Sequence, residues 1–235
     1  MSRASTLRTC SVLSAPDSTT KSTATNTSCS PVVGTAATSA KSAPHDLEVT
    51  PLSIFKKIEV SSDAGIQDVF RHLVIDTDRT AAICHEIKVA FDQGRKVLVL
   101  TERTEHLDAI LAGLTDKVPT LFVLHGRVSK KLRATVISEM ESLPPDVPRI
   151  LLATGKLVGE GFDHPPLDTL VLAMPVSWKG TLQQYAGRLH REHATKTDVR
   201  IVDFVDTGHP ALLKMWDKRQ RGYRAMGYRI APSTT

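Results

Sequence analysis

The chain has 235 residues, of which 41% are hydrophobic and 23% charged, and its formal net charge is +5. These proportions are ordinary for a globular protein, and no apolar run approaches the roughly 18 residues that a membrane-spanning helix needs. Three cysteines without a C-x-x-C pair argue against a disulfide framework and against a zinc site. We therefore expect a cytoplasmic protein without a metal site, whose basic charge permits a polyanionic partner without requiring one.

Residues 1–45 differ in composition from everything that follows. They are rich in Ser, Thr, Ala and Pro, contain no aromatic residue, and have Asp17 as their only acid. Such a segment buries too little apolar surface to offset the entropy lost on ordering, so a disordered tail is predicted. The same composition is typical of an organellar transit peptide, which leaves import as a minor alternative to a flexible tail or a start codon assigned too far upstream.

Residues 46–94 are expected to form a helical lead-in. Apolar residues recur at helical spacing over residues 69–74 and again over residues 83–91. The second of these helices has Asp76 or Thr77 as its predicted N-cap and ends at Gly94.

Short apolar runs then alternate with amphipathic helices. Strands are predicted over residues 97–100, 121–124, 150–153, 169–172 and 199–205, and helices over residues 102–114, 129–143, 181–189 and 210–226. Continuous apolar strands separated by helices are typical of a parallel sheet covered on both faces. The pattern therefore predicts a doubly wound α/β domain, beginning near residue 60, whose functional loops lie at the carboxyl ends of its strands.

The segment after the third predicted strand, residues 154–163, is rich in glycine. The hydroxyl and amide of Thr154 suit a phosphate oxygen, and the carboxylate of Asp163 could accept hydrogen bonds from a ribose. Spacing alone explains the segment equally well as a Gly-rich turn capped by Asp163. It is not a Walker A loop, because G-x-x-x-x-G-K-[ST] would require other residues at Ile150 and Leu157. No Walker A loop and no D-E-x-D/H tetrad occurs in the 235 residues.

A second polar segment runs from Gln184 to Arg191. Arg188 and Arg191 are three residues apart, so on a helix they project to the same side, with Gln184 one turn earlier. Gly187 removes the side chain beside them. Two neighbouring guanidinium groups are costly unless an anion lies between them, and polyphosphate fits their planar geometry. The alternative is a solvated basic helix end.

Together these segments resemble the C-terminal RecA-like lobe, of P-loop NTPase type, of superfamily 2 DEAD/DEAH-type helicases. Gln184-x-x-Gly187-Arg188-x-x-Arg191 is similar to motif VI, and Thr154 with residues 160–163 is similar to motif V. Residues 97–101 are similar to motif IV, and His125-Gly126 with Arg133 to the turn that precedes motif V. The resemblance places the domain at residues 95–230. The residues around motif VI look closest to those of helicase subunits of restriction-like, phage-defence conflict systems.

The resemblance implies roles for individual residues. Arg188 and Arg191 would be arginine fingers on the γ-phosphate of ATP, and Gln184 would couple that cleft to the nucleic acid. The nucleotide side would also include Gly161, Asp163 and Gly187, with Gly161 and Asp163 touching the ribose. The phosphates of the nucleic acid would be held by Thr101, Gly126, Arg133 and Thr154.

The resemblance also implies what the chain needs. ATP with Mg²⁺ would be bound mainly by a first lobe, which the 235 residues lack, so negligible ATPase activity is expected from the chain alone. The expected partners are nucleic acid, with DNA favoured over RNA, and a first-lobe protein or domain. The alternatives are a non-catalytic nucleic-acid-binding or interaction module and, least favoured, an unrelated α/β phosphate-binding enzyme.

The C-terminal segment is basic, with one acid, Asp217, and three interleaved aromatic residues. Its six basic residues are Lys214, Lys218, Arg219, Arg221, Arg224 and Arg229. Such a pattern is typical of surfaces that stack on single-stranded bases. A helix packed on its own sheet explains Trp216 better, and the role of the arginines stays open.

Overall fold

The computed structural model describes residues 46–58, 60–61, 64–155, 163–176 and 182–232. The tail expected over residues 1–45 and the predicted site residue Gly161 lie outside these ranges. None of the helices in these ranges has both the length and the apolar composition that a membrane span requires.

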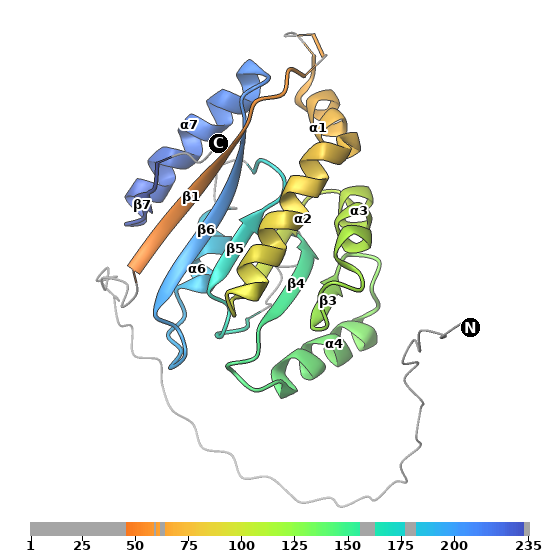
Figure 1. Cartoon of the computed structure of the whole chain (residues 1–235), viewed down its shortest axis with the longest axis vertical. Helices are drawn as coiled ribbons and strands as arrows, with labels where there is room; N and C mark the ends of the chain where they lie inside the picture. Colours follow the sequence, from red (N-terminus) through yellow and green to blue (C-terminus); the bar gives the residue numbers. More distant parts are fainter. Residues whose placement is uncertain (1–45, 59, 62–63, 156–162, 177–181, 233–235) are drawn as a thin grey trace, which may run out of the picture. The chain divides into compact units, whose positions relative to one another are not determined.

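Seven parallel strands form one sheet in the order β3-β4-β2-β5-β6-β1-β7 (Figure 1). Their bounds are Asp46–Ile54 for β1, Lys96–Thr101 for β2, Leu121–Leu124 for β3, Arg149–Thr154 for β4, Thr169–Leu172 for β5, Asp198–Asp206 for β6 and Arg229–Ile230 for β7. Every residue of β2, β4 and β5 is buried. Strands buried on both sides need helices on both faces of the sheet.

Helices cover both faces. They are α1 (Ile66–Ile75), α2 (Thr77–Asp92), α3 (Thr104–Leu114), α4 (Lys130–Ser142), α6 (Gln183–Leu189) and α7 (Pro210–Ala225). Val97 and Val99 of β2 share an apolar cluster with α2 and α3, whereas Leu98 and Leu100 pack with α4, α6 and α7. This alternation follows from the two-residue period of a strand and confirms the doubly wound α/β fold.

The helical lead-in expected over residues 46–94 is wrong at its start, because residues 46–54 form β1. This strand pairs with β6 along its whole length, from Asp46 beside Asp198 to Ile54 beside Asp206. Pro51 within this strand is unexpected, because proline has no backbone N–H to donate to a neighbouring strand. The missing N–H of Pro51 would point toward β7. That short strand pairs only with Glu48 and Val49, so the proline leaves no ladder bond unmade.

The second predicted helix is confirmed, including its cap. The Asp76 carboxylate accepts hydrogen bonds from the backbone amides of Asp78 and Arg79, at 3.1 and 3.2 Å. Gly94, with φ of +79°, follows the end of the helix, and glycine adopts this backbone conformation without steric cost.

Two buried arginines attach helices on opposite faces of the sheet to β6. Arg79 of α2 donates to Asp206 at 2.8 Å and to the carbonyl oxygen of Ala173. Arg219 of α7 donates to Asp203 at 2.7 Å, and the hydroxyl of Tyr223 donates to the same carboxylate. Buried charges are stable only when they are paired in this way.

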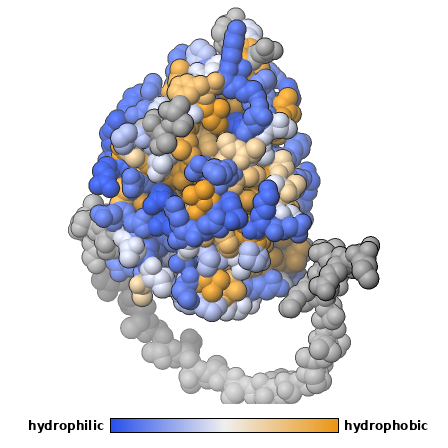
Figure 2. All heavy atoms as spheres, in the orientation of Figure 1, coloured by the Kyte–Doolittle hydropathy of each residue, from blue (hydrophilic) through white to orange (hydrophobic). Residues whose placement is uncertain are grey.

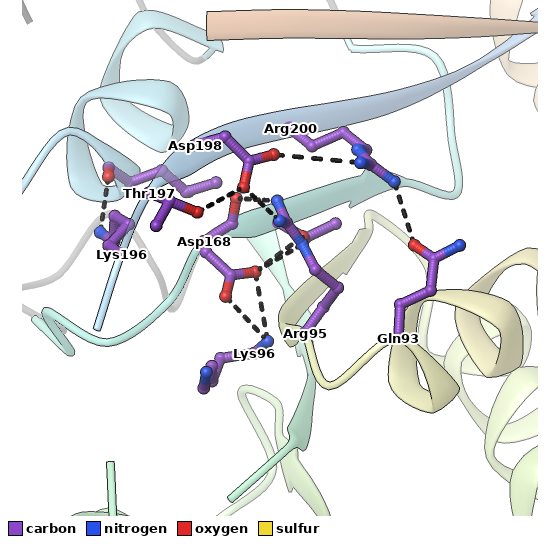
Figure 3. A network of polar contacts seen from close by, with 10 residues as sticks. Gln93, Arg95, Lys96, Asp168, Lys196, Thr197, Asp198 and Arg200 are labelled. Carbon is purple, nitrogen blue, oxygen red and sulfur yellow. Dashed lines mark hydrogen bonds and ion pairs between the residues drawn. The ribbon is translucent and has the colours of Figure 1, made fainter. Parts of the chain in front are cut away.

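A separate polar network joins the amino ends of β2, β5 and β6 (Figure 3). Arg95, just before β2, pairs with Asp168 at 3.1 Å and with Asp198 at 2.5 Å. Arg200 donates to Gln93 at 3.1 Å, which adds the end of α2. These contacts hold the edge of the sheet that lies opposite the strand carboxyl ends.

Candidate functional site

A pocket of about 390 Å³ lies at the carboxyl ends of β2 and β4. It is lined by Glu102, Thr104, Gly126, Thr154 and Gly155. The strands end at the same level because Thr101 and Thr154 are register partners. The turn that carries Gly126 is tied to α3 by Arg127, which donates to the Thr104 hydroxyl at 2.8 Å. Two of the predicted nucleic-acid residues, Gly126 and Thr154, thus line one pocket.

Thr101 lies beneath this pocket, not on its wall. Its side chain is 1% exposed, and its hydroxyl is hydrogen-bonded to Nδ1 of His106 on α3 at 3.1 Å. Burial, together with the charge of Arg79, lowers the pKa of His106 to about 4, so the imidazole is neutral. The Thr101 side chain therefore supports the start of α3, and the expected contact of its hydroxyl with a phosphate is not one that this conformation offers.

The start of α4 is strongly basic. Arg127, Lys130 and Lys131 are exposed, and the predicted residue Arg133 is half-buried one turn into the helix. The Ser129 hydroxyl caps the helix by accepting from the amide of Leu132 at 3.2 Å. Helix N-termini and cations both favour anions. Sequence reasoning missed the first three of these cations, although four bases and no acid between residues 127 and 133 are a visible signal.

Motif VI occupies α6 and the turn after it. Gln184 and Gly187 are exposed, Arg188 is half-buried, and a Cβ added at Gly187 would meet open space. Arg191 forms an ion pair with Asp163 at 3.4 Å, with 63% of the Arg191 side chain exposed. The structure therefore brings together one residue of the motif V segment and one of the motif VI segment, both of which the sequence assigned to the nucleotide side.

The expectation that Arg188 and Arg191 share one helical face is wrong, because α6 ends at Leu189. The buried Lys196 ammonium donates to the carbonyl oxygens of Leu189 and Arg191, at 2.7 and 2.9 Å. The ring of His190, between them, lies 2.8 Å from the hydroxyl of Tyr228. These bonds replace the helical ones and place Arg191 in a turn.

Lys196 also shows where this turn lies in the fold. It comes two residues before β6, and Figure 3 draws it beside the network at the amino ends of the strands. Burial lowers its pKa to about 8, while the nearby charges of Asp168 and Asp163 raise it. The Arg191–Asp163 pair is therefore toward the amino ends of β5 and β6, and the expectation that all functional loops lie at strand carboxyl ends is corrected.

Tyr185 connects the pocket to α6, and sequence reasoning did not single it out. A Cβ at Gly155 would overlap the Tyr185 hydroxyl, so a larger residue at this position requires the buried Tyr185 ring to shift. Burial raises the pKa of Tyr185 to about 12, the charge of Glu102 raises it further and that of Arg188 lowers it. One tyrosine of α6 therefore lies within electrostatic reach of the pocket wall and of a predicted arginine finger.

A larger hollow, of about 450 Å³, lies between α2 and α3, away from all the predicted site residues. Its lining includes Cys84, His85, Gly113 and Lys117.

On the face of the molecule shown in Figure 2, hydrophobic residues gather between hydrophilic ones. Among the described residues, no group of three His, Cys, Asp or Glu side chains is arranged to hold a metal ion.

Comparisons with known proteins agree with these motifs. The family described as helicase conserved C-terminal domain matches residues 78–193. Probable helicase D10 of Escherichia phage T5 is 27% identical over 143 residues, which cover 61% of this chain and 31% of that protein. Uncharacterized protein 108L of Invertebrate iridescent virus 3 is 37% identical over 99 residues, covering 41% of this chain and 86% of that protein.

The fold is shared with a solved structure. The crystal structure of T4 UvsW matches 81% of this chain and 42% of that chain with a TM-score of 0.63, at 17% sequence identity. This match confirms the RecA-like α/β fold. The chain spans less than a third of the phage T5 helicase. With motifs IV, V and VI in order along its sequence, the chain belongs to the family described as helicase conserved C-terminal domain.

Proposed function

We propose that this chain is the second lobe of an ATP-dependent nucleic-acid helicase or translocase, with two separate working surfaces. One is the pocket at the carboxyl ends of β2 and β4, and the other is the arginine group at α6. The observation that carries the proposal is Tyr185, which belongs to α6 and packs against Gly155 in the pocket wall.

The pocket is proposed to hold phosphates of the nucleic acid. Arg127 donates to the Thr104 hydroxyl in the pocket wall, and the exposed cations Lys130 and Lys131 follow it at the start of α4. The amides near Gly126 and Thr154 can donate to phosphate oxygens. Contacts of this kind provide affinity and orientation without sequence preference. DNA is the proposed track, and a matched RNA strand is the comparison that tests it.

The α6 surface is proposed to act on ATP. A first lobe, on the same polypeptide or another, would supply the P-loop lysine and the Mg²⁺-binding acids and would hold the nucleotide. Arg191 is mostly exposed and its 3.4 Å ion pair with Asp163 is weak, so it can exchange that carboxylate for a γ-phosphate. Arg188 would approach from the end of α6, with space beside it at Gly187. Asp163 would then be released to accept hydrogen bonds from the ribose.

Tyr185 gives a physical basis for coupling the two surfaces. Because its hydroxyl contacts the position where Gly155 has no side chain, a shift of α6 has to move the end of β4 or break this contact. Closure of the two lobes around ATP would in this way change the pocket that holds the nucleic acid.

The test is an ATPase assay with single-stranded DNA or RNA, with and without a separately produced first lobe. The 235-residue chain alone is expected to hydrolyse negligible ATP, and the pair is expected to gain activity. Arg191→Ala should lower the gained activity by about 10³-fold or more, as for arginine fingers in phosphoryl transfer. Arg71→Ala, an exposed arginine on α1, is the matched control and should change little. Gained activity that survives Arg191→Ala would rule out the finger, and robust turnover by the chain alone would contradict the need for a first lobe.

A non-catalytic nucleic-acid-binding module is the second candidate. It is favoured by the ion pair between Arg191 and Asp163, which satisfies the arginine without any nucleotide. On this alternative the chain binds nucleic acid, but adding it to a first lobe produces no ATPase activity.

A further inference from the structure

The exposed face of α7 carries a row of cations. The row, here called the α7 stripe, consists of Lys214, Lys218, Arg221 and Arg224, all exposed. The opposite face is buried and contains Leu212, Arg219, Gly222 and Tyr223. The margin of the molecule on which α7 lies in Figure 1 is mostly hydrophilic in Figure 2. The stripe is thus a surface feature of a helix whose other side is fixed to the sheet.

The stripe is not neutralised by the protein itself. In α1 and α2 cations form ion pairs with acids at helical spacing, as Arg71 does with Asp68 and Lys88 with Asp92. Asp217 lies at the same spacing from Lys214 and Arg221 on α7. Within the described part of the chain, none of the four stripe residues forms an ion pair. Like charges three or four residues apart on a helix are destabilising. The chain therefore retains repulsion on α7 that it relieves on two other helices.

The aromatic residues of this segment do not share its surface. Tyr223 is 0% and Tyr228 3% exposed, and Trp216 packs against Tyr223 with ring centroids 6.3 Å apart. Arg219 is buried and paired with Asp203. Base stacking by these side chains is therefore excluded in this conformation, and what α7 presents to solvent is a line of positive charge.

The charge is concentrated, not general. Residues 46–235 hold 26 Lys and Arg and 24 Asp and Glu, a net charge of +2. The stripe alone has four cations, with Asp217 as the acid of the same face. At 1.5 Å per residue, Lys214 and Arg224 are about 15 Å apart along the helix. That length spans about four phosphates of one strand of a duplex, at one charge per 3.4 Å.

We propose that the α7 stripe binds the phosphate backbone of nucleic acid as a second contact surface, separate from the pocket at β2 and β4. Lysine is depleted at protein–protein interfaces but binds phosphate as a point charge, so a Lys-containing row fits nucleic acid better than an acidic protein. The proposal rests on the proposed function, because it assumes that this lobe works on nucleic acid.

The position of α7 supports this assignment. It lies on the same face of the sheet as α6, since Tyr223 of α7 belongs to the same apolar cluster as Ala186 and Leu189 of α6. The pocket, in contrast, lies at the ends of β2 and β4, separated from β6 by β5 in the strand order. Nucleic acid that follows both surfaces would be held at two points on one rigid lobe, which adds affinity without new pocket contacts.

The test measures binding of the chain to a duplex of about 30 base pairs, and to the matching single strand, over a range of salt concentrations. The stripe variant is Lys214→Gln/Lys218→Gln/Arg221→Gln, and the control of equal charge change is Lys57→Gln/Arg71→Gln/Lys117→Gln, on other elements. Loss of three phosphate contacts should lower the slope of log K against log salt by about 2 to 3 for the duplex. Affinity should fall by at least about tenfold, and the control should fall by less than about threefold. A larger effect on the duplex than on the single strand assigns the stripe to duplex DNA, and the reverse assigns it to the displaced strand.

Two further arms separate the possible failures. If the stripe variant binds like the control while Lys130→Gln/Lys131→Gln at the pocket abolishes binding, the stripe proposal is wrong and the proposed function stands. If the stripe variant keeps nucleic acid but loses binding to poly-glutamate, the stripe takes an acidic polypeptide and the proposal is overturned. If the unaltered chain binds neither strand form at low salt, the proposed function fails together with it.

Discussion

Arginines in two regions of this molecule behave in opposite ways. At β6, Arg79 and Arg219 are 2% and 1% exposed, and each is held by an aspartate of that strand. At α6, Arg191 is 63% exposed and has one loose ion pair with Asp163. A charge that is buried and fully paired is part of the core. A charge that is exposed and loosely paired can be given to a ligand at little cost in stability.

The largest expected effect is the loss of a buried pair. Arg219→Ala leaves the Asp203 carboxylate in the core without its cation, and should lower the free energy of unfolding by about 3–5 kcal/mol. Urea denaturation of the variant and the unaltered chain measures this. Arg224→Ala, exposed on the same helix, should stay within about 0.5 kcal/mol. A cost below about 1 kcal/mol for Arg219→Ala would remove the distinction between the two regions.

Buried histidines extend the comparison to groups whose burial outweighs any partner charge. Burial lowers the pKa of both His106 and His164 to about 4, with the positive charges of Arg79 and Arg149 also contributing. Because the folded pKa lies below the unfolded value of 6.5, their stabilisation is present above pH 6.5 and is lost as the pH falls toward 4. Lowering the pH from 7 to 5 should therefore reduce the free energy of unfolding by about 2 kcal/mol for each of these histidines.

The measurement is urea denaturation at both pH values. His106→Gln should reduce the difference in unfolding free energy between pH 7 and pH 5 by about 2 kcal/mol. His85→Gln, at an exposed position on α2, should leave this difference unchanged. An unaltered pH dependence in His106→Gln would mean that this imidazole is not buried uncharged.

An effect of similar size is expected at the contact between the two proposed surfaces. Gly155→Ala forces its methyl group into the Tyr185 hydroxyl and should destabilise the chain by about 1–3 kcal/mol. Adding Tyr185→Phe, which removes that hydroxyl, should recover part of the loss. Thermal unfolding checks both variants, with Gly187→Ala, which meets open space, as the control. Equal melting temperatures for the single and double variants would show that the contact is not the cause.

The smallest effect is expected at the exposed pair. Asp163→Asn should change the free energy of unfolding by less than about 1 kcal/mol, because both side chains are solvated. Denaturation at low and high salt measures it. A loss above about 2 kcal/mol would place Arg191 with the structural arginines of β6 and against a role on ATP.

Most of the sheet could be predicted because its strands are buried on both faces and read as continuous apolar runs. The predicted ranges 121–124 and 169–172 coincide with β3 and β5. β1 and β7 were missed because neither has such a run. β1 alternates polar and apolar residues around Pro51, and β7 has two residues. Their strand conformation comes from pairing with β6 and with each other, which no local pattern records.

The candidate site divides in the same way. Gly126 and Thr154 were predicted from motifs and share a pocket, whereas Tyr185 and Lys196 were not predicted. A tyrosine inside motif VI looks like one more core residue until its hydroxyl is seen against Gly155. Lys196 looks like a surface lysine until its ammonium is found at the end of α6.

The sequence alone identified the motif residues of this helicase lobe and predicted a parallel sheet with helices on both faces. It could do so because the periodicity of apolar residues and the spacing of motifs are local properties of the chain. Where those residues lie was decided by tertiary structure. The pocket residues gather at the carboxyl ends of β2 and β4, while Asp163 and Arg191 meet on the α6 side near the amino ends of β5 and β6. The physical reason is that these placements depend on contacts between residues far apart in the chain, such as the pairing of β2 with β4 and the ion pair between Arg191 and Asp163, which no local pattern records.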